Sequence, residues 1–479
     1  MVRKGLPCNK YKPLTDEDVS KVNDTAMRVI EEVGFEVHSN RALEIFESGG
    51  ATVDHRKHRV RMSRDKVQEL IEKAPDTINL CGREEKHDIL LGGNRVYAGT
   101  GGTALYMYDA STGQRKLATL YDLKRISRLV HHLDNIHLYM LPVYPNEIDS
   151  VHVDVNRFFA GLDNTSKHIM GGVYTRRGVQ QVIKMAEIIA GSKEALRQRP
   201  IVSMVACVIS PLKIDRHYGD LIIDIADSGI PLVCPAEPLC GATSPITLAG
   251  NLVLQITDSL LGVTLSQLCN PGTPVIFGSV ASNMDYGRYS YLAGSVEMGL
   301  VNAAGAQMAQ FYKLPFYATG GMTDSKMLDA QAGYESSITS LLCALSGANF
   351  IHDAAGLMEF ALSMSLEKMV IDNEILGMVM RAVEGIKVND ETLSFKLIKE
   401  VGPGGNFLNV RQTRQYMRKE HYHPLLSDRS DREEWEAKGK RATWQKASRR
   451  VKELLDREKY SLPDETRKMV LKEIKDIVT

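Results

Sequence analysis

The sequence has no excess of either charge. Lys and Arg together number 59, and so do Asp and Glu. A protein without net charge does not attract a polyanion over its whole surface, so neither nucleic acid nor an anionic membrane is expected as a partner. No run of about 18 apolar residues is free of charges, which argues against a transmembrane helix.

Signals for secretion and for disulfide bonding are also absent. The first residues, MVRKGLPCNKYKPLTDEDV, lack the apolar stretch of a secretion signal. The seven cysteines are odd in number, scattered along the chain, and form no CxxC pair. We therefore expect a cytoplasmic protein with reduced thiols.

Common catalytic and metal-binding motifs are missing as well. The sequence contains no HExxH, no P-loop and no Cys/His pattern with metal-ligand spacing. No intrinsic metal is expected.

The sequence does contain a regular alternation of short apolar segments and longer amphipathic ones, beginning near residue 96. The predicted strands are Ala104–Tyr108, Ile136–Leu141, His168–Tyr174, Ile201–Ile209, Leu232–Pro235, Pro274–Gly278, Pro315–Thr319 and Asn349–His352. The predicted helices lie near 121–133, 150–163, 176–191, 215–228, 246–269, 293–313, 328–346 and 365–385. Eight such units predict a (β/α)8 TIM barrel over residues 96–388.

Two alternatives to this assignment stay open. The same units would also build an open, doubly wound sheet. The first strand is ambiguous, because its residues also fit a hairpin that turns around Ser111-Thr112-Gly113. Outside the barrel, we predict an N-terminal helical extension over 1–95 and a C-terminal helical appendage over 389–479.

Reactive groups of such barrels gather at the carboxyl ends of the strands, where this chain offers aromatic and small residues. Such a pocket suits a trimethylammonium group, which only π faces and diffuse negative charge can hold. Candidate faces are Tyr97, Tyr144, Tyr174, Phe277 and Tyr317. For each tyrosine taken singly, a core residue with a satisfied hydroxyl is the favoured explanation.

Two ionisable residues follow predicted strands. Glu237 is the candidate for the negative charge, because an unpaired buried carboxylate is costly and needs a reason. His352 either orients a carboxylate of the substrate or is structural. Two glycine pairs, Gly101-Gly102 and Gly320-Gly321, either admit a large ligand or form plain turns.

Four stretches of the sequence resemble the trimethylamine methyltransferase superfamily. They are GATSPITLAGN at 241–251, the segment FGSVASNMDYGRYS…GGMTDSK at 277–326, DAQAGYESSITSLLCALSGANFIHDAAGL at 329–357, and NFLNVRQTRQYMRKEHYHPLLSDRS at 406–430. The resemblance covers nearly the whole chain and implies a soluble homo-oligomer with a TIM barrel. It also implies a cognate corrinoid protein, whose cob(I)alamin docks over the barrel mouth and leaves as methylcobalamin. In that case Gly101, Gly102, Asn283, Gly320 and Gly321 are predicted to face the cofactor.

The chain departs from that family in one respect. The trimethylamine enzymes carry pyrrolysine, whereas this sequence contains only the twenty standard residue types. A quaternary amine needs no such residue, because its nitrogen already has four bonds and a positive charge and leaves as a neutral tertiary amine. Members without pyrrolysine resemble enzymes for glycine betaine. The resemblance therefore predicts methyl transfer from glycine betaine by direct displacement, without a catalytic nucleophile or base.

Other interpretations of the same sequence remain. The substrate could be another quaternary amine such as proline betaine, carnitine or choline. A protein that binds a betaine without reacting with it is a second alternative. A zinc-dependent methyltransferase is disfavoured, because no His/Cys cluster follows the strands.

Overall fold

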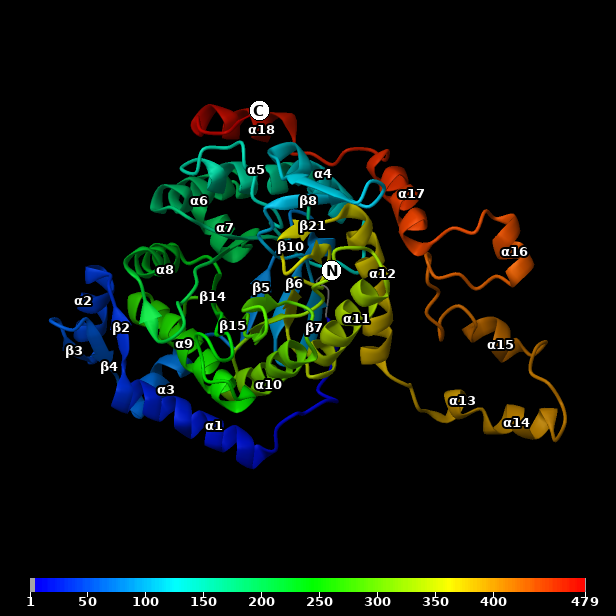
Figure 1. The fold of residues 1–479 in the computed structure, drawn as a ribbon, viewed down its shortest axis with the longest axis horizontal. Coiled ribbons are helices and arrows are strands. Elements are labelled where there is room, and N and C mark those ends of the chain that lie inside the picture. Colours follow the sequence, from blue (N-terminus) through cyan, green and yellow to red (C-terminus); the bar gives the residue numbers. More distant parts are fainter. Residues whose placement is uncertain (1–4, 479) are drawn as a thin grey trace.

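The computed structural model describes residues 5–478 as an α/β fold built on a curled sheet of nine strands with helices around it (Figure 1). Eight of the strands run parallel, and β1 (Leu6–Pro7) is added antiparallel to the first of them. The eight are β7 (Arg95–Ala98), β10 (Tyr139–Met140), β11 (Ile169–Gly172), β12 (Val202–Val205), β14 (Leu232–Ala236), β15 (Val275–Ser279), β18 (Phe316–Thr319) and β19 (Phe350–His352). A parallel bridge joins Gly99, just after β7, to Leu138, just before β10.

Seven of the eight predicted strands are confirmed, and the first is wrong. The first parallel strand is β7, whereas the predicted segment forms the hairpin of β8 (Tyr106–Asp109) and β9 (Gln114–Leu117). The Asp109 carboxylate accepts hydrogen bonds from the backbone N–H groups of Ser111 and Thr112, and Gly113 has a φ of 70°. These are turn contacts, so local chemistry decides in favour of the hairpin.

Eight helices cover the outside of the sheet, as predicted to within a few residues. They are α4 (Leu120–His131), α5 (Val153–Asn164), α6 (Arg176–Ala190), α8 (Arg216–Ser228), α9 (Leu248–Cys269), α10 (Val296–Tyr312), α11 (Ala330–Leu345) and α12 (Leu366–Glu384), with the short α7 (Lys193–Gln198) after α6. The start of α4 follows capping chemistry: the Thr119 hydroxyl accepts from the Asp122 N–H, and the Asp122 carboxylate accepts from the Thr119 N–H.

The inside of the curled sheet is filled at one end only. Apolar side chains of all eight parallel strands form a compact cluster there with the hairpin of β5 (Thr77–Leu80) and β6 (Ile89–Gly92). Ile78, Leu80, Ile89 and Leu91 alternate along this hairpin and point into the cluster. The amino-terminal end of the sheet is thereby closed, which leaves open space only at the carboxyl ends of the strands.

Two small sheets border that open end. One is the hairpin of β16 (Asn283–Asp285) and β17 (Ser290–Leu292). The other joins β20 (Leu357–Met358) and β21 (Ser363–Met364) to β8 and β9. Both are insertions after strands of the main sheet, so they are placed to contribute side chains to a site at its mouth.

The sequence predicts a helical N-terminal segment, but the structure contains both helices and strands there. The predicted helices are present as α1 (Asp16–Arg28), α2 (Asn40–Ser48) and α3 (Arg64–Lys73). Between them, β2 (Phe35–Val37), β3 (Thr52–Asp54) and β4 (Arg59–Arg61) form a sheet with β13 (Lys213–Ile214). Strands of two or three residues are too short for a hydrophobic alternation to reveal them.

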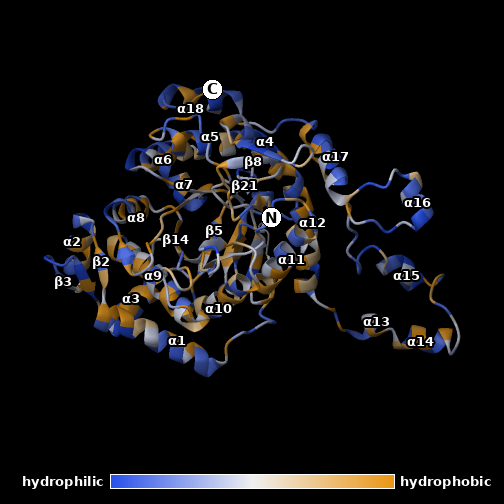
Figure 2. Ribbon diagram, in the orientation of Figure 1, coloured by the Kyte–Doolittle hydropathy of each residue, from blue (hydrophilic) through white to orange (hydrophobic). Residues whose placement is uncertain are grey.

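The C-terminal segment begins as an arm that extends away from the body (Figure 1). Its helices are short and bury no residue: α13 (Asp390–Leu393), α14 (Phe395–Val401), α15 (Arg411–Tyr416) and α16 (Arg432–Ala437). Apolar side chains such as Ile386, Phe395 and Leu408 are exposed along it, and hydrophobic residues are visible at α13 and α14 in Figure 2. The chain then returns to the body through α17 (Thr443–Leu455) and α18 (Asp464–Glu473).

Within residues 5–478, one helix is long and apolar enough to cross a membrane by length and composition. It is α9, and 83% of its most apolar window is buried inside the structure. It packs against β14 and β15, so the apolar composition is that of a core helix.

Candidate active site

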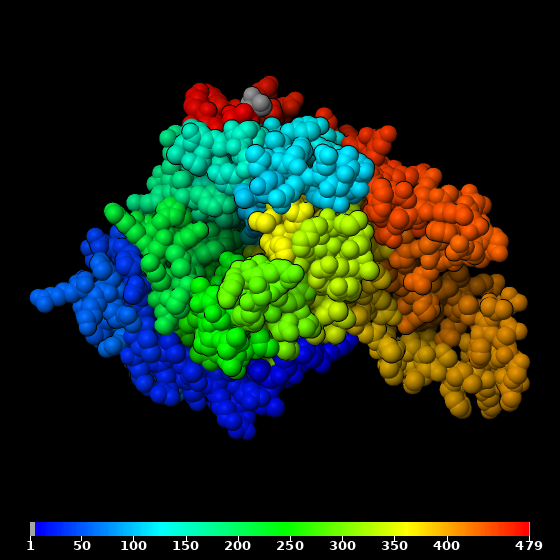
Figure 3. Space-filling view, viewed as in Figure 1, coloured from blue at the N-terminus to red at the C-terminus, as the bar shows by residue number. Residues whose placement is uncertain are grey.

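A cavity of about 450 Å³ lies at the carboxyl ends of the parallel strands. Figure 3 shows a hollow near the centre of this face, bordered by green and yellow segments. Its size falls within the range of roughly 300–1,000 Å³ that is usual for small-molecule sites. The lining includes neither Lys nor Arg, and its charged residues are Glu237, His352 and Asp353. A larger hollow beside α17 is less suitable, because most of its charged lining is already paired, for example Lys446 with Asp428.

Glu237 follows β14 and presents its carboxylate to the cavity. The Glu237 side chain is exposed to the cavity, but protein surrounds the cavity and keeps most bulk water away from the carboxylate. This partial removal from bulk water raises the pKa of Glu237; the Asp353 carboxylate raises it further, and His352 acts in the opposite direction. No residue from 5 to 478 forms a hydrogen bond or ion pair with the Glu237 carboxylate in the structure. Glu237 is thus an acidic group available to a ligand.

His352 and Asp353 form a close pair beside it. His352 Nε2 lies 2.8 Å from Asp353 Oδ2, and Nδ1 lies 3.2 Å from the Ala318 carbonyl and 3.0 Å from Thr319 Oγ1. The Thr319 hydroxyl donates to the Ser279 carbonyl, so Nδ1 carries a hydrogen in the assignment that satisfies every contact.

This pairing has two consequences. Asp353 has His352 as its ion-pair partner, so Glu237 is the carboxylate of the cavity that has none among the described residues. Because Nε2 is paired with the Asp353 carboxylate, His352 is not free to hold a carboxylate of a ligand. Its ring stacks on Tyr317, with centroids 4.0 Å apart.

The cavity has several aromatic faces. Tyr174 and Tyr317 are predicted from the sequence and line it, whereas Tyr218, Tyr291 and Phe360 line it without having been predicted. The other three predicted residues lie elsewhere: Tyr97 at the closed end of the sheet, Tyr144 behind Tyr174, and Phe277 in the core against Tyr312 and Phe316.

Tyr218 lies in the first turn of α8, whereas the other two unpredicted aromatics come from insertions. Tyr291 lies on β17, and Phe360 lies between β20 and β21 in a turn with three consecutive positive φ angles, at residues 359–361. Such backbone conformations are rare outside glycine, and no sequence pattern announces them. The Lys326 ammonium lies 4.1 Å from the centroid of the Phe360 ring.

The two predicted glycine pairs are explained by the packing of the chain itself. A Cβ on Gly101 would lie 1.9 Å from Asp353 Oδ1, one on Gly102 2.6 Å from the Pro142 carbonyl, and one on Gly321 2.6 Å from Ala354 Cα. Gly102 lines the cavity, whereas Gly101, Gly320, Gly321 and Asn283 do not. Asn283 Oδ1 accepts a hydrogen bond from the Ser295 hydroxyl. Except for Gly102, these residues are not part of the site proposed below.

The packing of Gly101 allows a test. Gly101→Ala is expected to displace Asp353, to lower activity several-fold, and to destabilise the protein by about 1–3 kcal/mol, as overpacking does. Gly333→Ala in α11 is the matched control, because its Cβ would meet no atom within 4 Å. That change should be neutral or stabilising. Equal activity of both variants and the unsubstituted protein would show that the Gly101 contact does not matter.

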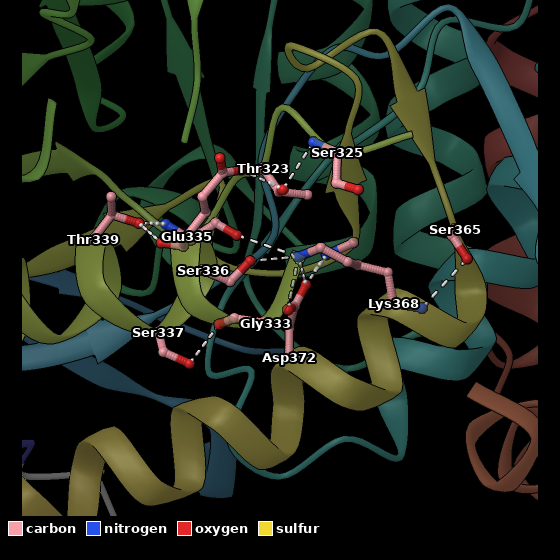
Figure 4. A network of polar contacts seen from close by, with 12 residues as sticks. Thr323, Ser325, Gly333, Glu335, Ser336, Ser337, Thr339, Ser365, Lys368 and Asp372 are labelled. Atoms are coloured by element: carbon pink, nitrogen blue, oxygen red, sulfur yellow. Dashed lines mark hydrogen bonds and ion pairs between the residues drawn. The ribbon is translucent and has the colours of Figure 1, made fainter. Parts of the chain in front are cut away.

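A buried polar network fixes the loops after β18 and β19 (Figure 4). Lys368 Nζ contacts both oxygens of Asp372, at 2.8 and 2.7 Å, and donates to the Ser336 hydroxyl. Asp372 accepts from the Gly356 N–H in the loop after β19. In the loop after β18, the Gly321 N–H donates to the Thr339 hydroxyl. Helices α11 and α12 therefore hold both loops that carry the cavity wall.

No group of three or more His, Cys, Asp or Glu side chains among residues 5–478 is arranged to hold a metal ion.

Fold and site together define an α/β protein with a small-molecule cavity at the carboxyl ends of its parallel strands. The family model for trimethylamine methyltransferase (MTTB) matches residues 2–476. The chain belongs to this family of methyltransferases, which act on methylated amines, and the resemblance inferred from the sequence is confirmed.

Two relatives from Desulfitobacterium hafniense are named for different amines. The chain is 39% identical to trimethylamine methyltransferase MttB of strain DSM 10664 / DCB-2, over 90% of this chain and 87% of that one. It is 33% identical to glycine betaine methyltransferase of strain Y51, over 93% and 92%. The solved monomethylamine methyltransferase MtmB of Methanosarcina barkeri shares the fold, with a TM-score of 0.50 at 11% identity over 94% of this chain and 95% of that one.

Proposed function

We propose that this protein transfers a methyl group from a quaternary amine, glycine betaine, to the Co(I) corrinoid of a partner protein, and releases dimethylglycine. The observation that carries the proposal is the cavity with several aromatic faces and one unpaired carboxylate, Glu237. Aromatic faces and a single negative charge suit a cation that has no N–H to donate. The twenty standard residue types of the chain support a quaternary over a tertiary amine.

The reaction needs no proton transfer. The carbon–nitrogen bond breaks with its electron pair staying on nitrogen, and the methyl carbon bonds to cobalt. The residues of this chain bind and align the donor, and they exclude water from it. A ring of carboxylates would stabilise the cation before reaction and slow the step that removes its charge. One carboxylate among aromatic rings is a suitable compromise.

The mouth of the cavity also supports docking of a corrinoid protein. Exposed apolar side chains project from loops after several strands of the main sheet: Leu105, Ile209, Ile246, Tyr289 and Leu362. A corrin is a broad macrocycle, and an apolar rim on both sides of the mouth fits it and the protein surface around it. We infer further that the main sheet is a (β/α)8 barrel, closed where Gly99 pairs with Leu138.

Product analysis tests the proposal. Incubation of the protein with glycine betaine and a reduced corrinoid should yield one dimethylglycine for each methylated corrinoid. Without the reduced corrinoid no dimethylglycine should appear. Its absence from the complete reaction, with the protein folded and the corrinoid reduced, would overturn the proposal, as would its formation without any corrinoid.

A further inference from the structure

Arg157 is a fully buried arginine without a carboxylate partner. It lies on α5, and no acidic side chain among residues 5–478 forms an ion pair with it. The nearby Asp154 carboxylate instead accepts from the backbone N–H groups of Tyr174 and Thr175. Asp154 therefore acts on Arg157 electrostatically but not through a direct contact, and the guanidinium directs its N–H groups at hydroxyl and carbonyl oxygens instead. This arrangement calls for a functional explanation.

The guanidinium reaches the cavity wall indirectly. Its Nη2 donates to Thr103 Oγ1 at 2.9 Å and to the Leu141 carbonyl at 2.8 Å, and its Nη1 donates to the Tyr174 hydroxyl at 3.3 Å. Thr103 and Tyr174 both line the cavity. Arg157 Nε has no hydrogen-bond partner among the described residues.

The cavity wall formed by Thr103 and Tyr174 has a hydroxyl hydrogen that no other group among the described residues accepts. Thr103 Oγ1 accepts from Arg157 and, at a longer 3.5 Å, from the Tyr174 hydroxyl. Its own hydrogen has no acceptor within residues 5–478 and is free to point into the cavity. Since both hydroxyls accept from a guanidinium, both are polarised as donors, and the Tyr174 hydrogen can leave its long 3.5 Å contact with Thr103 for a ligand. Such a wall favours an anion.

The wall with Thr103 lies opposite the side of the cavity that carries Glu237. Thr103 follows β7 and Glu237 follows β14, which are four strands apart among the eight parallel strands and therefore lie on opposite sides of the curled sheet. One side of the cavity is positively polarised through Arg157, and the other carries the unpaired carboxylate. A ligand that has a cation at one end and an anion at the other matches both sides.

We propose that Thr103 and Tyr174 form a subsite for the carboxylate of the substrate, with Arg157 as the positioning residue behind them. The inference rests on the proposed function and deepens it: the substrate class is a quaternary amine that carries a carboxylate. Choline, which lacks a carboxylate, is disfavoured. The sequence suggested that His352 orients the carboxylate of the substrate. We assign this role to the two hydroxyls instead, because His352 is paired with Asp353.

Calorimetry on the full chain tests the subsite with two ligands, glycine betaine and tetramethylammonium, of which only the first has a carboxylate. Thr103→Val removes the hydroxyl and keeps the shape. It is expected to weaken glycine betaine binding about tenfold, the usual loss for one hydrogen bond to a charged group, and to leave tetramethylammonium binding within twofold. Thr100→Val is the matched control, because the Thr100 hydroxyl donates to the Met140 carbonyl and Thr100 does not line the cavity.

A second variant covers the case in which Thr103→Val does not fold. Tyr174→Phe, with Tyr144→Phe as its control, should lower the preference for glycine betaine in the same way. Equal weakening of both ligands, no weakening of glycine betaine, or no binding of glycine betaine to the unsubstituted protein would overturn the subsite. Binding is measured without corrinoid, so failure of methyl transfer with the preference intact would overturn only the proposed function.

Discussion

Glu237→Gln is expected to lower kcat/KM for glycine betaine by about ten- to a hundredfold, mostly through KM. The substitution keeps the shape of the side chain and removes the unpaired negative charge of the cavity. A charge-assisted contact in an enclosed site contributes on the order of 1–3 kcal/mol, which corresponds to this range. Steady-state kinetics with a reduced corrinoid as the second substrate measures the effect.

A control substitution shows whether the effect depends on a carboxylate inside the cavity or on any carboxylate near it. Glu297→Gln changes a carboxylate in the first turn of α10 that does not line the cavity, and kinetics should be unaffected. Glu237→Gln should melt no earlier than the unsubstituted protein, because the raised pKa means that ionised Glu237 does not stabilise the fold near neutral pH. Unchanged kinetics of Glu237→Gln would assign Glu237 to the scaffold.

The pH dependence of substrate capture follows from the same residue. A cation binds the ionised form of Glu237, so 1/KM should rise with pH through a pKa above the ordinary 4.5 of a glutamate. Bound substrate favours ionisation in turn and lowers that pKa. The rise should disappear in Glu237→Gln, and its persistence there would assign it to another group.

Lys368→Met is expected to destabilise the protein by about 3–5 kcal/mol, since it leaves the Asp372 carboxylate buried without its partner. Burial already raises the pKa of Asp372, and loss of the ammonium raises it further. The folded state then binds more protons than the unfolded state, so the variant should lose stability as the pH rises from 5 to 8. Urea unfolding at both pH values measures this.

The partner substitution is the control. Asp372→Asn in the Lys368→Met background removes the stranded charge and keeps an oxygen for the Gly356 N–H. The double variant should regain most of the lost stability and lose the pH dependence. A double variant as unstable as Lys368→Met would mean that packing of the lysine stem, and not charge, holds the loops after β18 and β19.

The main sheet and its helices are predictable from the sequence because the alternation of apolar segments reflects burial. The errors occur where local contacts decide: Asp109 and Gly113 turn the predicted first strand into a hairpin. The short strands β2, β3 and β4 carry too few residues for a periodicity. Both kinds of error concern segments outside the repeated unit of strand and helix.

The site was only partly predictable. Glu237, His352, Tyr174 and Tyr317 were found because they lie at or just after strands, where side chains converge on the cavity. Tyr291 and Phe360 reach the cavity from insertions whose path no sequence pattern encodes. Arg157 could have been identified from the sequence, because it is the single arginine among the mostly apolar residues of α5. A charged residue on the buried side of a helix points to a partner across the interface.

The most direct measurement of the central claim compares a quaternary with a tertiary amine under identical conditions. The loss of Co(I) absorbance of a reduced corrinoid is followed with glycine betaine and, separately, with trimethylamine. The account predicts methylation of the corrinoid by glycine betaine and none by trimethylamine, whose nitrogen lacks the fourth bond and the positive charge. Methylation by trimethylamine at the same rate would contradict it.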